Sequence, residues 1–180
     1  GLIGGYWGGR VDMVVVWLVD ILLAFPGILL AISIVAVLGP SLTNALIAIS
    51  ITQIPIYTRI VRSATLALKG SEYVQAAQAL GSGAPRIVFG HILPNSLSPL
   101  LVQITMSTGT AILDVAALGF LGLGAQPPAA EWGVMISDGF NRFREAPWLS
   151  IAPGLAIFLS VIGFNLLGDA LRDALDPRLN

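Results

Sequence analysis

Four long apolar segments govern what this chain can fold into. They cover residues 14–38, 42–60, 97–121 and 148–167, and a helix needs about 20 apolar residues to cross a bilayer. Of the 180 residues, 56% are hydrophobic and only 11% are charged, whereas soluble domains carry roughly 25% charged residues. The sequence therefore predicts an all-α fold, a polytopic transmembrane helical bundle that forms a single domain over residues 1–180.

The first residues carry a separate expectation. Gly1 opens the sequence in a stretch with the composition of a helix interior, without an initial Met and without a signal peptide. We therefore expect a fragment that lacks an N-terminal helix. Residues 1–9 are too short to span a bilayer. They fit either the tail of a helix, in which Gly1, Gly5 and Gly9 permit close helix contact, or a flexible loop.

Polar and helix-breaking residues inside the apolar segments are candidates for a translocation path. Pro26 interrupts the first segment, and both a packing kink and a role in gating fit it. Asp20 and Asp114 lie within apolar segments, where a charge is costly and usually faces the bundle interior or a water-filled cavity. We hypothesise that Asp114 lines the path or braces an external gate. A structural hydrogen bond to a neighbouring helix is the alternative.

Residues 70–95 form a polar stretch that is patterned like structure. The Ala-rich segment Glu72–Leu80 predicts a short amphipathic helix, which Gly81 and the residues after it break. A second short helix is expected over Pro85–Leu93, ended by Pro94 because proline lacks the N–H that a helix needs. We interpret this elbow as a surface that another protein grips, and an ordinary loop between membrane helices is the alternative.

Lysine and arginine residues set the orientation, since they are enriched on the cytoplasmic side of a membrane. With the elbow inside, only Arg142 and Arg144 fall outside, in an external loop over residues 122–147. Within that loop, Trp132–Phe143 is amphipathic and fits either an interfacial anchor or a binding surface. We expect the elbow and the C-terminus in the cytoplasm, together with Arg10, Arg59, Arg62, Lys69, Arg86, Arg172 and Arg178.

Several kinds of chemistry lack their residues in this sequence. The only lysine, Lys69, follows Leu68 and precedes Gly70, so the Gly-Lys-Ser/Thr core of a nucleotide-binding P-loop is missing. One histidine and no cysteine leave no usual ligand set for a metal. A net charge of −1 without a basic tract gives no reason to expect a nucleic-acid partner. We therefore expect a chain that is not an enzyme and holds no cofactor or metal.

Three motifs resemble one family of transporters. Ala76-Ala77, Gly81 and His91-Ile92-Leu93-Pro94 are spaced as in the EAA loop of ABC importer permeases of type I, although Gln75 stands where that family usually has Glu and His91 where it usually has Ile. The His-x-Leu-Pro-Asn form is similar to the dipeptide, oligopeptide and nickel branch. The segments LGFLGLGAQPPAAEWG and FNLLGDALRDALDPRLN resemble peptide-importing permeases.

The resemblance implies that the elbow is a coupling helix that docks on a cytoplasmic ATPase subunit. It implies a second permease subunit, two P-loop ATPase subunits that hold ATP and Mg²⁺, an external substrate-binding protein, and the bacterial inner membrane as location. Ala76 and Ala77 would pack closely into the ATPase, and Gly81 would permit the turn. The coupling residues it implies are Glu72, Tyr73, Gln75, Ala76, Ala77, Leu80, Gly81, His91 and Pro94.

The function expected is therefore that of a permease subunit of an ATP-driven importer for di- or oligopeptides. Nickel, glutathione or another small solute are alternative cargoes, because the permease sequence carries little information on cargo. An ion-driven secondary transporter with broken helices is an alternative from another class. It predicts internal repeats, of which we see no convincing example, and it leaves the elbow unexplained. A purely structural scaffold explains neither the elbow nor the external loop.

Overall fold

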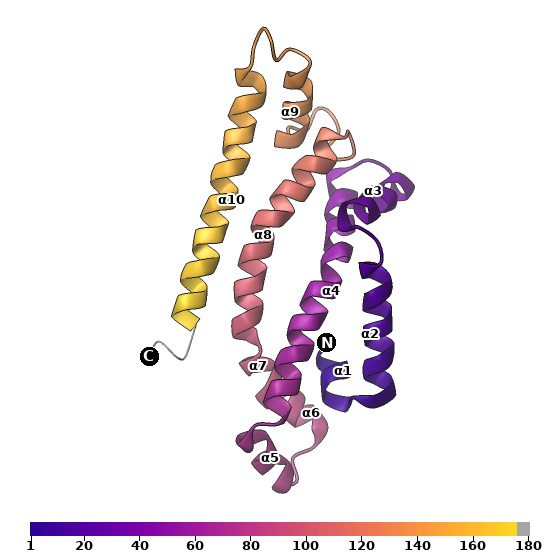
Figure 1. Ribbon diagram of the computed structural model, residues 1–180, viewed down its shortest axis with the longest axis vertical. Coiled ribbons are helices and arrows are strands. Elements are labelled where there is room, and N and C mark those ends of the chain that lie inside the picture. Colours follow the sequence, from indigo (N-terminus) through magenta and orange to yellow (C-terminus); the bar gives the residue numbers. More distant parts are fainter. Residues whose placement is uncertain (176–180) are drawn as a thin grey trace. The chain divides into compact units, whose positions relative to one another are not determined.

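The computed structural model describes residues 1–175, and the expected position of Arg178 lies outside this range. Every regular element in the described part is helical (Figure 1), which confirms the predicted all-α fold class. The longer helices are α2 (Gly9–Leu23), α3 (Gly27–Leu38), α4 (Leu42–Lys69), α8 (Leu97–Phe120) and α10 (Trp148–Leu175). The shorter elements are α1 (Leu2–Trp7), α5 (Glu72–Ala79), α6 (Ala84–Ile87), η1 (Val88–Ile92), α7 (Leu93–Asn95) and α9 (Trp132–Phe140).

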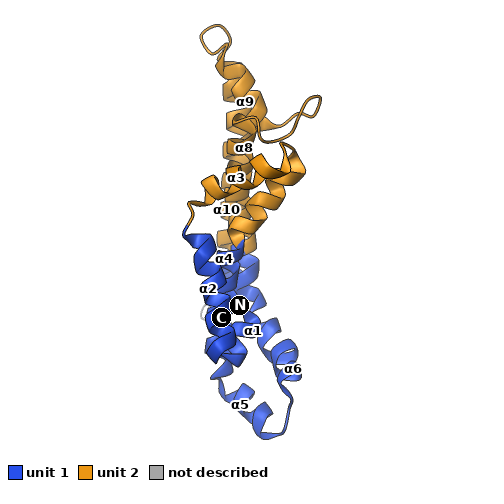
Figure 2. Ribbon diagram, turned by 90° about the vertical axis from the view of Figure 1, so that its right-hand side faces the viewer, with its two compact units in different colours: residues 1–24, 54–103, 171–180 blue, residues 25–53, 104–170 orange. Residues whose placement is uncertain are grey.

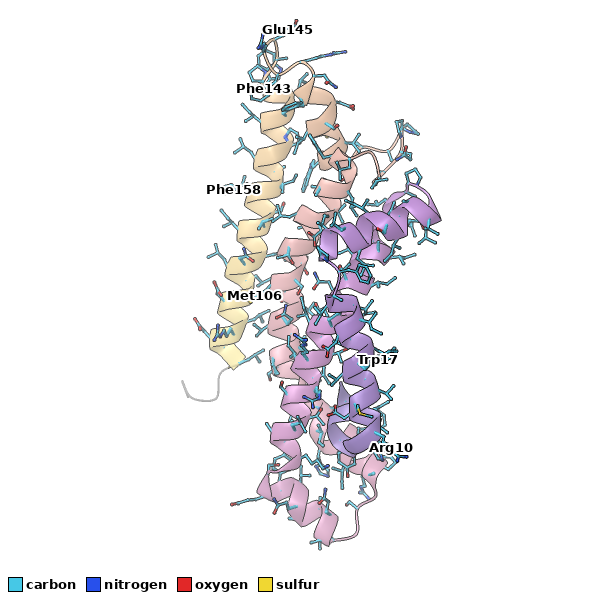
Figure 3. All side chains as sticks on the ribbon, turned by 45° about the vertical axis from the view of Figure 1, so that its right-hand side comes forward. Arg10, Trp17, Met106, Phe143, Glu145 and Phe158 are labelled. Carbon is cyan, nitrogen blue, oxygen red and sulfur yellow. The ribbon has the colours of Figure 1, made fainter. Side chains whose placement is uncertain are left out.

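Within residues 1–175, three helices are long and apolar enough to cross a membrane: α4, α8 and α10. The number rises to four if the pair α2 and α3 is a single broken span. Large apolar side chains on these helices are exposed, such as Trp17 at 62% and Phe158 at 57% (Figure 3). A water-soluble protein rarely exposes apolar surface so extensively. The helices therefore suit an apolar surrounding of lipid or further helices.

Two helices extend beyond the predicted spans. The helix expected over residues 42–60 runs on to Lys69, with Pro55 inside it. The helix expected over 148–167 continues to Leu175, past Arg172, which we expected in the cytoplasm. The length of an apolar segment underestimates the length of a helix whose polar end continues beyond the bilayer. The side chains become polar at the interface, but the backbone hydrogen bonds of the helix continue. The membrane boundaries on these helices stay predictions.

The segment predicted as the span 14–38 is not one continuous helix. It comprises α2, which ends at Leu23, and α3, which begins at Gly27 after Pro26 as its N-cap. Pro26 has φ −56° and ψ 126°, an extended conformation that a helix interior does not contain. The break falls where the sequence predicts a kink, but it separates two helices.

Contacts divide the chain into two compact units (Figure 2). One contains residues 1–24, 54–103 and the described end of the chain from Leu171, and it includes the elbow. The other contains residues 25–53 and 104–170, and it includes the external loop. The core of this second unit brings together buried apolar residues of α3, α4 and α8: Ala31, Val35, Ala45, Ala48, Ile49 and Leu118.

Candidate functional site

The first helix of the elbow, α5, ends in a glycine turn. Gly81 has φ +81°, in the left-handed region that favours glycine. Its N–H donates to the Gln78 carbonyl at 2.9 Å, and the Ser82 N–H donates to the Ala77 carbonyl at 3.0 Å. This pair of bonds is the Schellman motif, which closes a helix and reverses the chain. The glycine break predicted from sequence is therefore a defined turn.

The second half of the elbow differs from the prediction of one helix ended by Pro94. Helical backbone continues through Pro94 by way of α6, the π-helical turn η1 and α7. The Leu93 N–H bonds to the Val88 carbonyl five residues earlier. In an α-helix a proline ring collides with the carbonyl four residues before it, and the wider π turn relieves that collision. The turn explains why Pro94 does not end the helical path.

An apolar core holds the two halves of the elbow together. Val74 of α5 packs with Ile87 and Ile92 from the second half, and the exposed fraction of each is 1% or less. Three half-buried residues complete this core, which we call the elbow core: Leu2 and Tyr6 of α1, and Leu68 of α4. The elbow is thus a folded element and not a bare connector, as its sequence pattern predicts.

The opposite side of α5 carries an exposed apolar face. Tyr73 is 44% exposed and Leu80 is 88% exposed, with the exposed Ala76 between them. Residues three and four apart lie on the same side of a helix. We call Tyr73, Ala76 and Leu80 the α5 face. The structure therefore brings three of the predicted coupling residues onto one surface, while Ala77 is half-buried beside them.

The remaining predicted coupling residues have local roles. The His91 ring lies 6.3 Å from the Tyr73 ring, centroid to centroid, and the His91 carbonyl accepts a hydrogen bond from Asn95 Nδ2 at 2.6 Å. Gln75 Nε2 donates to the Gly70 carbonyl at 3.0 Å, directly after the end of α4. Glu72 is exposed in the first turn of α5, where a negative charge is favourable.

The candidate residues for a translocation path are divided between the two units. Asp20 lies in the unit that contains the elbow, where Arg59 pairs with it at 3.0 Å. Asp114 lies half-buried on α8 in the other unit, and Pro26 caps α3 there. Nothing in this geometry assigns them a common role, so their part in a path stays a prediction.

Sequence reasoning missed the residues that support the elbow from α1. Leu2 and Tyr6 pack on the elbow core although more than 60 positions separate them from it in sequence. No local pattern distinguishes an apolar residue that packs there from one that faces lipid. Only the placement of α1 beside the elbow identifies them.

The external loop contains the helix α9, in agreement with its amphipathic pattern. Glu131 is its N-cap residue, and its Oε2 accepts a hydrogen bond from the Ala125 N–H at 3.2 Å. Trp132 is 41% exposed and Trp148 is 63% exposed, so both rings are available to an interface. The loop is an ordered element with a surface of its own.

Comparison with known proteins assigns the chain to a family. The family described as binding-protein-dependent transport system inner membrane component matches residues 1–180. A dipeptide transport system permease protein of Alkalihalophilus pseudofirmus is 58% identical over 179 residues, which are 99% of this chain and 59% of that protein. One of Haemophilus influenzae is 49% identical over 179 residues, 99% of this chain and 61% of that protein.

A relative named for glutathione transport is nearly as similar as the Haemophilus influenzae protein. A glutathione transport system permease protein of Pectobacterium atrosepticum is 48% identical over 179 residues, 99% of this chain and 60% of that protein. The chain thus spans about three fifths of the length of these relatives. The family match over the whole sequence, the apolar helices and the folded elbow agree, and the chain belongs to the family of binding-protein-dependent transport system inner membrane components.

Proposed function

We propose that this chain is the permease subunit of an ATP-driven importer and forms half of the translocation path for di- or oligopeptides. The observation that carries the proposal is the elbow, in which a buried core supports an exposed apolar α5 face with Leu80 at 88% exposure. In a protein of this family, such a face suits a partner that covers it. An ATPase subunit on the cytoplasmic side is that partner, and the C-terminus lies on the same side.

The names of the relatives support a peptide as cargo. Proteins named for dipeptide transport and for glutathione transport are 48–58% identical to this chain over 179 aligned residues. Glutathione is therefore the alternative cargo that a specific observation favours. None of the relatives described above is named for nickel or for an ion-driven transporter. The family description says that such transport systems depend on a binding protein, and in this proposal an external binding protein delivers the cargo.

The residues of the elbow perform the mechanical part of the mechanism. ATP and Mg²⁺ bind to the partner subunits, and the closing of those subunits displaces the α5 face. Ala76 keeps the centre of that face small enough for close approach. Gly81 and the buried Val74 preserve the shape of the elbow, so the displacement is passed to α4 and α8 and is not absorbed by bending. This motion shifts the permease between inward-open and outward-open states.

A matched pair of charge substitutions tests the docking of the α5 face. Leu80→Glu places a negative charge on the face, and Gln78→Glu adds the same charge to an exposed position on the other side of α5. In the full-length complex purified from membranes, we expect Leu80→Glu to lower the amount of co-purified ATPase at least about tenfold, because the interface would bury an unpaired charge. Gln78→Glu should retain the ATPase.

Two results would contradict the proposal. One is a Leu80→Glu complex that retains its ATPase and its transport rate in proteoliposomes. The other is a wild-type protein that purifies without any ATPase and moves solute on an ion gradient. Because Leu80 is exposed, a loss caused by misfolding is not expected, and the elution profile of the permease pair on size-exclusion chromatography checks this.

A further inference from the structure

We propose that the α1–α2 hairpin, residues 2–23, is a coupling element that moves with the elbow, and that Tyr6, Asp12 and Arg62 are its positioning residues. This inference rests on the proposed function and names the part of the chain that receives the motion of the elbow. The elbow is joined covalently only to α4 and α8. The hairpin is a third connection, made by side chains.

The first step is the contact between the hairpin and the elbow. Leu2 and Tyr6 of α1 pack on the elbow core. Tyr6 is also held by Lys69 at the end of α4: Lys69 Nζ donates to the Tyr6 carbonyl at 2.6 Å and lies 5.4 Å from the centre of the Tyr6 ring. Tyr6 thus contacts the elbow and the helix that leads into it, and a displacement of the elbow acts on α1 directly.

The second step is the close fit of α1 against α4. A Cβ added at Gly1 would lie 2.8 Å from the Val61 Cβ, and one added at Gly5 would lie 2.9 Å from the Thr65 Cβ. Side chains larger than hydrogen therefore do not fit at Gly1 and Gly5 without a shift of α1. The two helices are in contact at backbone distance, so they are not free to slide past each other. Gly9, the third glycine at this spacing, has φ +54° and no neighbour within 4 Å. It begins α2 directly after the turn at Gly8 and makes no close contact with α4.

The third step is an ion pair that fixes α2 to α4. Arg62 Nε and a second guanidinium nitrogen donate to the two carboxylate oxygens of Asp12 at 2.6 and 2.5 Å. The side chains are 32% and 18% exposed. A bidentate pair fixes orientation as well as distance. The neighbouring pair of Arg59 and Asp20 has one contact of 3.0 Å and is 62% and 54% exposed, so it is expected to hold α2 far less firmly.

Through these contacts the hairpin passes motion of the elbow on to the chain at Pro26. A segment that is packed on the elbow, fitted against α4 and fixed by a bidentate ion pair moves with them or loses all three contacts. Its second helix ends at Leu23, immediately before the break at Pro26. Motion of the elbow is therefore delivered to the chain at Pro26 as well as through α4 and α8. This arrangement supports the predicted gating role of Pro26 more directly than the proline alone does.

Cysteine labelling in the assembled transporter tests the inference. Residues 1–180 contain no cysteine, and the transporter without an introduced cysteine gives the background labelling. Arg10→Cys reports on the hairpin, where Arg10 is exposed at the start of α2 (Figure 3). Leu80→Cys reports on the α5 face. The probe is a membrane-impermeant maleimide, applied with and without ATP and vanadate. We expect ATP and vanadate to change the labelling rate of Arg10→Cys about threefold or more.

The response is then compared in variant backgrounds. Tyr6→Ala and Arg62→Gln should each reduce the change at Arg10→Cys to less than about 1.5-fold and lower the amount of peptide transported per ATP hydrolysed. Tyr6→Phe keeps the aromatic packing and should restore both. Arg59→Gln is the matched control on the same helix, since it removes the same charge from the exposed pair, and it should leave the labelling response unchanged.

The outcomes separate this inference from the function on which it rests. If ATP-bound ATPase subunits protect Leu80→Cys while Arg10→Cys does not respond, the hairpin is not a coupling element and the proposed function stands. A response of Arg10→Cys that persists in Tyr6→Ala and Arg62→Gln overturns the inference as well. If Leu80→Cys is labelled equally with and without the ATPase subunits, the proposed function fails and the inference fails with it.

Discussion

The elbow and the external loop are both connections between long helices, but they are held in opposite ways. Large buried side chains hold the elbow, with Ile87 and Ile92 almost fully buried around Val74. The external loop is held by backbone approach at glycines. A Cβ added at Gly133 would clash with the backbone of Ala116, and one added at Gly139 would lie 2.8 Å from the backbone carbon of Leu149. The elbow is stabilised by the packing of buried side chains. The external loop is stabilised where glycines, which lack a side chain, allow backbone segments to approach closely.

A polar anchor adds to this difference. In the external loop the Glu131 carboxylate accepts the Ala125 N–H and occupies the space beside Gly119 and Gly124, where an added Cβ would clash with it. Its Oε1 is buried and has no hydrogen-bond partner among the described residues. The elbow core is purely apolar except for the tyrosine hydroxyl. The external loop is therefore held by close contacts at glycines and by the Glu131 carboxylate, and not by a core of large apolar side chains.

The largest effect is expected where the backbone contact of the loop is blocked. Gly133→Val would drive its side chain into the Ala116 carbonyl, and α9 would have to move away from α8. We expect a loss of more than about 3 kcal/mol in the free energy of unfolding, at the upper end for overpacked sites. Thermal unfolding of the purified permease pair in detergent measures it.

The control for this substitution is a helical glycine with open space around it. Gly163→Val in α10 meets no atom within 4 Å and should change stability by less than about 0.5 kcal/mol. Equal losses at the two glycines would mean that helix propensity, and not backbone contact, decides the effect. The external loop would then not differ from the elbow in being held by backbone contact at glycines.

A smaller effect is expected from a cavity in the elbow. Ile92→Ala removes most of a side chain that is 0% exposed and should lower the free energy of unfolding by about 2–3 kcal/mol, within the range for buried Ile to Ala changes. Phe89→Ala, in the same π turn but 64% exposed, should have little effect. Limited proteolysis after Arg86 compares how readily the elbow opens in the two variants.

The Glu131 carboxylate is expected to contribute less to the free energy of unfolding. Glu131→Ala leaves the Ala125 N–H without its acceptor, at a cost of about 1–2 kcal/mol. Glu145→Ala removes the same side chain from an exposed position of the same loop and should be neutral. Thermal unfolding again measures both, and a neutral Glu131→Ala would show that the glycine contacts alone hold the loop.

The elbow was more accessible to sequence reasoning than the external loop, for a physical reason. A short amphipathic helix and a glycine turn are local, so Glu72–Ala79 and Gly81 could be predicted from neighbouring residues. The π turn before Pro94 could not, because it depends on how the chain relieves one steric collision. Contacts such as Tyr6 on the elbow core or Gly133 on Ala116 join distant or unpatterned positions, and a single sequence carries no signal for them.

The smallest effect concerns the residue in which the elbow departs from its family pattern. Gln75→Glu restores the residue that the EAA motif usually has, but a carboxylate cannot donate to the Gly70 carbonyl as the Gln75 amide does at 3.0 Å. Because this hydrogen bond is exposed, we expect a loss of only about 0.5 kcal/mol in stability. Gln75→Ala loses the same bond without adding a charge, so the difference between the two variants measures the repulsion between carboxylate and carbonyl. If Gln75→Glu is instead more stable than wild type, the amide does not hold the start of the elbow to the end of α4. The elbow would then be held by its apolar core alone, in a still sharper contrast with the polar anchor of the external loop.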